Sequence, residues 1–164
     1  MSYGGELVDL YPRVSPIYWL AVARAGEAID LLFSGQARTM GWSKFFETYP
    51  VAMHPDFPAA LETCAEITGV PGQPQERQWS GMADWLRRAQ DATQQKAPQG
   101  YVVALFNLGI DLKGETAGER RANLQEAANS FQRAAEVYAA LNDLAMLERS
   151  RTEIAAISTI LANL

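Results

Sequence analysis

The chain has 164 residues and a formal net charge of −5, and 48% of its residues are hydrophobic and 20% charged. This balance suits one globular domain with a core of reasonable size. The acidic balance argues against general binding of nucleic acid, because phosphate recognition needs a basic field. Each of the two local basic clusters, Arg87–Arg88 and Arg120–Arg121, has acidic residues nearby in the sequence.

Cysteine content and the apolar runs indicate the cellular location of the protein. The single cysteine, Cys64, rules out an internal disulfide framework and fits a reducing compartment. The N-terminus has no basic stretch followed by an apolar run, so we expect no signal peptide. The most apolar run, Ile17–Ala23, is far shorter than the roughly 20 residues that a transmembrane helix needs. We therefore expect a cytoplasmic protein without a membrane partner.

The first predicted helix begins at Ser15-Pro16, because serine caps helices and proline suits the first helical position. It runs to about Phe33, and Gly35 is a suitable stop. A second, short helix is predicted within Met40–Tyr49. Its aromatic residues recur at i, i+3, i+4 and i+7 and form one stripe: Trp42, Phe45, Phe46 and Tyr49.

Prolines punctuate the middle of the chain. Pro50 and Pro55 bound a predicted turn, after which Asp56 caps a helix from Phe57 or Pro58 to Thr68 that Gly69 stops. The stretch 70–75, VPGQPQ, is predicted to be a loop. If the chain has two regions, residues 1–75 and 76–164 meet at this loop, and both still fit one compact domain.

The remaining chain shows helical spacing throughout. A helix over 75–96 ends at Pro98-Gln99-Gly100, and three further helices are predicted over 101–113, 123–141 and 144–162. Asn142-Asp143 supplies the cap of the last one. No segment alternates with period two, so we expect an all-α fold without a sheet.

Residues 101–141 contain a pattern of two helices joined by a polar insert. It consists of Asn107-Leu108-Gly109, then Gly118-Glu119-Arg120, then the stretch NLQEA at 123–127, followed by Phe131, Ala134 and Tyr138. This pattern resembles a tetratricopeptide (TPR) repeat. It is most similar to the long-insert TPRs of bacterial arrays associated with CHAT proteases, in which a polar insert separates the two helices. Here the insert is 111–122, and the resemblance covers about residues 76–156, with one full repeat and two halves. Residues 1–75 show no repeat.

The resemblance implies a TPR-like solenoid of about seven helices, built of helical hairpins. Small residues such as Gly109 and Ala127 let two helices approach closely, and large ones such as Phe131 fill the gaps. It also implies a non-catalytic module that binds a protein or peptide partner in bacterial regulation or signalling. In TPR proteins polar side chains of the concave face bind extended peptides, which makes Asn107 and Asp111 the candidate partner-binding residues. Arg87 and Arg88 are further candidates, although solvated surface is their simplest interpretation.

The chemistry-bearing residues point away from catalysis. His54 and Cys64, the only histidine and cysteine, lack a protease signature around them. His54-Pro55-Asp56 spells the tripeptide of J-domain co-chaperones, but the preceding aromatic stretch is not the basic helix of that family, so a turn is the better interpretation. One histidine and one cysteine cannot build a standard zinc site, and phosphate-binding and dinucleotide-binding glycine patterns are absent. We expect no enzyme activity and no cofactor.

Three alternatives stay open, and one of them is an enzyme that uses His54 or Cys64. The stripe Trp42, Phe45, Phe46 and Tyr49 is interpreted first as core packing, but it could also line an aromatic pocket of a small-molecule-binding or sensor domain. Self-association into a homo-oligomer is the third alternative.

Overall fold

The computed structural model describes residues 25–68, 74–116 and 119–164. Every regular element within these ranges is a helix, which confirms the all-α prediction for the described part of the chain. None of the helices described there is long and apolar enough to cross a membrane. In chain order the elements are α2 (Ala25–Ser34), α3 (Gln36–Met40), α4 (Trp42–Thr48), the 3-10 helix η2 (Pro50–Met53), α5 (Phe57–Thr68), α6 (Pro74–Lys96), α7 (Pro98–Gly114), α8 (Arg120–Ala140) and α9 (Leu144–Ala162).

Glycines separate the first three described helices. Helix α2 ends before Gly35, whose φ of +80° confirms the predicted stop, while the predicted start at Ser15-Pro16 lies outside the described residues. The prediction of a single helix in Met40–Tyr49 missed α3, which precedes α4. Gly41, with a φ of +92°, divides α3 from α4, because most other residues are strained in this conformation.

The segment that follows α4 is more regular than the predicted turn. Pro50–Met53 forms η2, with proline in its first turn, and α5 then begins at Phe57 and ends at Thr68 as predicted. The predicted stop at Gly69 and most of the predicted loop lie outside the described residues. The side chain of Cys64 lies outside them as well.

Helix α6 ends at Lys96 as predicted, but Pro98 also begins the next helix. The structure places it in the first turn of α7, and the connection between α6 and α7 is the single residue Ala97. Proline fits there because the first amide groups of a helix have no partner within it. Helix α7 therefore starts three residues before the predicted Tyr101.

The predicted insert 111–122 is partly helical. Helix α7 extends to Gly114 and α8 already begins at Arg120, so both helices shorten the connection. The last helix has the predicted bounds, and the predicted cap is present, since the Asp143 carboxylate accepts a hydrogen bond from the Met146 amide at 3.2 Å.

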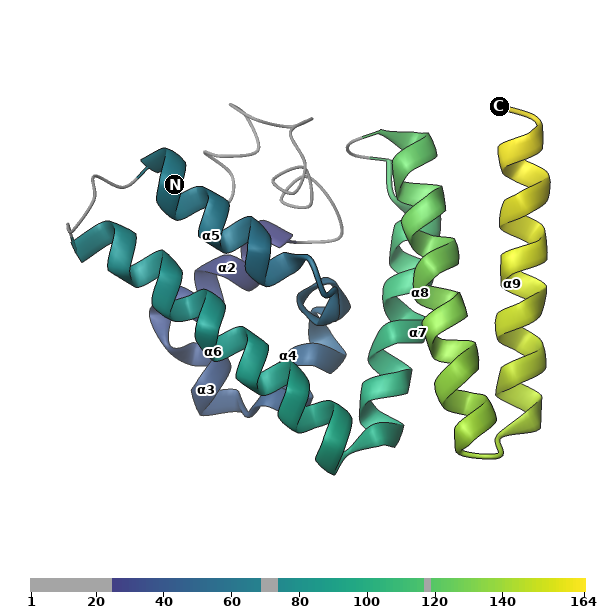
Figure 1. Ribbon diagram of the computed structural model, residues 1–164, viewed down its shortest axis with the longest axis horizontal. Helices are drawn as coiled ribbons and strands as arrows, with labels where there is room; N and C mark the ends of the chain where they lie inside the picture. The colour runs from purple at the N-terminus through teal and green to yellow at the C-terminus, as the bar shows by residue number, and fades with distance from the viewer. Residues whose placement is uncertain (1–24, 69–73, 117–118) are drawn as a thin grey trace.

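Helices α7, α8 and α9 lie side by side, each running opposite to its neighbour along the chain (Figure 1). Helix α8 packs against both α7 and α9. On its other side α7 packs against α4, η2 and α6, and α6 in turn packs against α5. Helix α7 is thus the element that connects the N-terminal helices to the C-terminal ones.

One buried cluster runs through both halves of the chain and includes Ile29, Phe45, Leu86, Leu108 and Phe131. Helix α7 buries an apolar face that includes Val102, Leu105, Leu108 and Leu112.

One large aromatic side chain of α6 lies partly at the surface. Leu86 and Ala89 are buried, but Trp85 is 36% exposed. The guanidinium of Arg38, on α3, lies 3.6 Å from the centre of the Trp85 ring, an arrangement typical of cation–π stacking at a surface. The side chain of Trp79 lies outside the described residues.

Candidate functional site

A pocket of about 370 Å³ opens between the end of α4, the start of η2 and the last two turns of α7. Asn107 and Asp111 lie one turn apart on α7, so both side chains are on the same face of the helix. The structure thus brings these two predicted partner-binding residues together. The full lining consists of Glu47, Thr48, Pro50, Asn107, Ile110, Asp111, Gly114 and Glu115.

The pocket is electronegative. Three of its eight lining residues are carboxylates, Glu47, Asp111 and Glu115, and none of the eight is basic. Helices α4 and α7 also end here, at Thr48 and Gly114, and the C-terminal end of a helix carries partial negative charge. Such a surface favours a cationic group over an anionic one.

The aromatic stripe holds one wall of this pocket in place but does not line it. Phe45 and Phe46 are fully buried or nearly so, Tyr49 is 8% exposed, and Trp42 packs partly buried against the same core. The ring centres of Trp42 and Phe46 are 6.0 Å apart, in a stacked arrangement. In the described structure these rings fill the interior between helices, and the intervening residues Glu47 and Thr48 reach the pocket.

The two candidate arginines of α6 lie elsewhere. Arg87 is ion-paired with Glu62 of α5 and lies 3.6 Å from Asp84 of its own helix, while Arg88 is exposed. The hydrogen bond and charge of Arg87 hold the pKa of Glu62 below its usual value, despite an opposing effect of burial. Neither arginine lines the pocket beside Asn107.

A second hollow, of about 740 Å³, lies where the turn between α8 and α9 meets the start of α7. Its lining is mostly apolar and includes two exposed side chains, Val103 (45% exposed) and Leu144 (66%). No local sequence pattern indicates this hollow, because its residues come from three helices.

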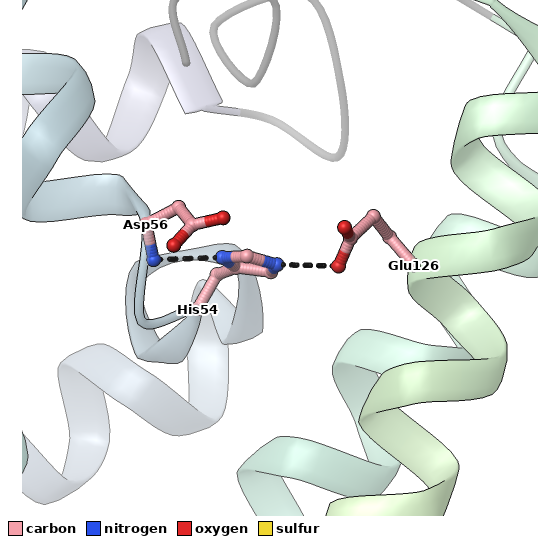
Figure 2. A group of neighbouring side chains, drawn as sticks. All are labelled: His54, Asp56 and Glu126. Atoms are coloured by element: carbon pink, nitrogen blue, oxygen red, sulfur yellow. Dashed lines mark hydrogen bonds and ion pairs between the residues drawn. The ribbon is translucent and has the colours of Figure 1, made fainter. Parts of the chain in front are cut away.

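His54 lies at the corner between η2 and α5 and is fully buried. Figure 2 shows its ring between two partners. The backbone amide of Asp56 donates a hydrogen bond to Nδ1 at 2.9 Å, and Nε2 lies 2.9 Å from Oε2 of Glu126 on α8. The ring therefore connects the start of α5 to α8.

Hydrogen bonding determines which ring nitrogen of the neutral His54 carries the proton. Because an amide N–H donates to Nδ1, this nitrogen is the acceptor, so Nε2 carries the proton and donates it to Glu126. Gln90 of α6 supports the same corner: its amide nitrogen donates to the carbonyl oxygens of Ala52 and His54 at 2.7 and 3.0 Å.

This proton position argues against a metal site at the same cluster. Ligand atoms of His54, Asp56 and Glu126 lie within 4.8 Å of one another, which is close enough for a shared cation. A metal bound at Nε2 would require that nitrogen to lose its proton. The proton could move to Nδ1 only if Nδ1 lost its hydrogen bond from the Asp56 amide. Metal-bound histidine normally donates from its second nitrogen, and that arrangement is blocked here.

Glu126 makes the stability of this contact depend on pH. The hydrogen bond from His54 is the main cause that lowers the pKa of the Glu126 carboxyl below its usual 4.5, and Arg133 adds to the effect. Because the pKa of this carboxyl is lower in the folded than in the unfolded protein, its ionisation stabilises the fold at pH values above the unfolded-state pKa. This contribution is lost as the pH falls through the folded-state pKa. We expect Glu126→Gln to cost about 1 kcal/mol in urea unfolding at pH 7, because a charged acceptor is replaced by a neutral one.

The difference between native protein and Glu126→Gln should shrink as the pH falls below about 4.5, the ordinary value for this carboxyl. Glu136→Gln, on the exposed side of α8, is the matched control and should unfold like the native protein. An equal gap between native protein and Glu126→Gln at pH 7 and pH 3 would contradict this assignment.

No family model matches this chain, and no curated protein or solved structure matches it. The resemblance to long-insert TPRs therefore stays a prediction from residues 76–156.

Proposed function

We propose that this protein is a non-catalytic module that binds a protein or peptide partner, and that the pocket between α4 and α7 takes a basic side chain of that partner. The observation that carries the proposal is the convergence of Asn107 and Asp111 with Glu47 and Glu115 on one hollow surface. The close antiparallel hairpin of α7 and α8 supports the TPR-like solenoid as the scaffold for this site.

Charge and shape favour a lysine or arginine side chain as the occupant. Three carboxylates and two helix ends attract a cation, and the Asn107 amide adds a polar contact beside them. Pro50 and Ile110 supply apolar surface on which the methylene groups of such a side chain can pack.

Panning of displayed random peptides against the whole protein tests this proposal. We expect the enriched peptides to share a lysine or arginine at one position. Replacement of that residue by glutamine, and the Asp111→Asn variant, should each weaken binding by about three- to tenfold, as measured by fluorescence anisotropy. Binding should also weaken as salt is raised.

Two control variants separate this pocket from other surfaces. Glu136→Gln changes the net charge as Asp111→Asn does but lies on the exposed face of α8, so it should bind normally. Leu144→Ser alters the apolar hollow and should bind normally too. Selected peptides without a shared basic residue, or a loss of binding in Leu144→Ser alone, would overturn the proposal.

A further inference from the structure

The corner between η2 and α5 contains a group whose bonding depends on its proton count. His54 is the only histidine of the chain and is fully buried. In its neutral form it uses both nitrogens, one as acceptor for the Asp56 amide and one as donor to Glu126. We propose that His54 is a proton-controlled joint: the neutral ring connects the start of α5 to α8, and a second ring proton breaks the bond to α5.

The conflict arises at Nδ1. A protonated ring carries N–H groups on both nitrogens and has no acceptor left. The proton on Nδ1 would then face the Asp56 amide, which lies 2.9 Å away, so two donors would oppose each other in a buried place. Turning the ring over does not remove the conflict, because both nitrogens are then donors.

The surrounding charges determine which bond survives. The carboxylate of Glu126 on α8 attracts a charged ring, and that of Asp56 at the start of α5 lies in the same cluster. Arg133 of α8 is a second cation near Glu126 and, like His54, lowers the pKa of that carboxyl. The α6 side chain at this corner, Gln90, is uncharged and binds the His54 carbonyl oxygen in either state. The charged ring therefore keeps Glu126 and gives up the Asp56 amide.

The expected consequence is local. Gln90 continues to hold η2 through the Ala52 and His54 carbonyl oxygens, while the first turn of α5 loses the bond that anchors it to the ring. Protonation of the ring thus removes the hydrogen bond between His54 and the first turn of α5. This inference does not depend on peptide binding at the pocket between α4 and α7.

Nuclear magnetic resonance of the native protein tests the joint directly, since a single histidine gives one unambiguous ring signal. At high pH the ring should be found in one neutral form, with the proton on Nε2. As the ring takes up its second proton, protection of the Asp56 amide against hydrogen exchange should fall about tenfold. The Leu141 amide at the end of α8, which donates to the Val137 carbonyl oxygen at 2.9 Å, is the internal control and should keep its protection.

Glu126→Gln provides a second measurement. Glutamine can still accept a hydrogen bond from Nε2, so the neutral ring of this variant should keep its proton on Nε2 and its bond from the Asp56 amide. The proposal is overturned if the ring takes up its second proton while the Asp56 amide keeps its protection. It is also overturned if the neutral ring carries its proton on Nδ1.

Discussion

Replacing Phe131 by alanine is expected to lower the free energy of unfolding by about 3–5 kcal/mol, because it leaves a large cavity in the interface between α7 and α8. Phe131 is fully buried, and its ring meets that of Phe106 edge-on, with 5.2 Å between the ring centres. Urea unfolding of the native and variant proteins measures the loss.

Two further substitutions calibrate this result. Phe131→Leu should cost less than Phe131→Ala, because leucine refills part of the space. Gln132→Ala changes the exposed neighbour on α8 and should leave stability within about 0.5 kcal/mol of native. A loss below about 1 kcal/mol for Phe131→Ala would contradict the burial of this ring.

Gly109→Ala is expected to destabilise the protein, although alanine is the better helix former. A Cβ at position 109 would lie 2.8 Å from Cε1 and Cζ of Phe131, far closer than packed carbon atoms allow. The ring has no free space to move into, because it is fully buried against Phe106. Overpacking should cost about 1–3 kcal/mol and outweigh the gain of up to about 1 kcal/mol in helix propensity.

Gly81→Ala, in the interior of α6, is the matched control for the glycine substitution. A Cβ there meets nothing within 4 Å, so the same change should stabilise the protein by about 0.5–1 kcal/mol. The two glycine substitutions should therefore shift urea midpoints in opposite directions. In a Phe131→Leu background Gly109→Ala should cost less, and strict additivity of the two changes would refute a direct clash.

The contact between Gly109 and Phe131 agrees with what the spacing of residues in the sequence predicted. The repeat-like pattern predicted that small residues such as Gly109 let two helices approach and that Phe131 fills the gap between neighbours. The structure brings these two residues together directly, Gly109 on α7 and Phe131 on α8. The pattern suffices because each helix buries one face, and spacing along the chain determines which residues share it.

Only part of the candidate site could be predicted from the sequence. Asn107 and Asp111 could be paired from the sequence, because one helical turn separates them. Their neighbours Glu47 and Thr48 come from a short helix about 60 residues earlier, and no periodicity reports that distance. Arg87 and Arg88 were named as further partner-binding candidates, but Arg87 pairs with Glu62 of α5.

The partner of His54 could not be predicted from the sequence. Glu126 lies 72 positions further along the chain, so the contact between their side chains could not be inferred from local pattern. The residue sequence by itself determined the helical class, most helix bounds and the buried faces, because these follow from local backbone preferences and apolar spacing. Only the tertiary structure decided that a lone histidine connects α5 to α8 and that α4 and α7 enclose a pocket. Such contacts arise from packing between distant segments, whose relative placement depends on the whole core.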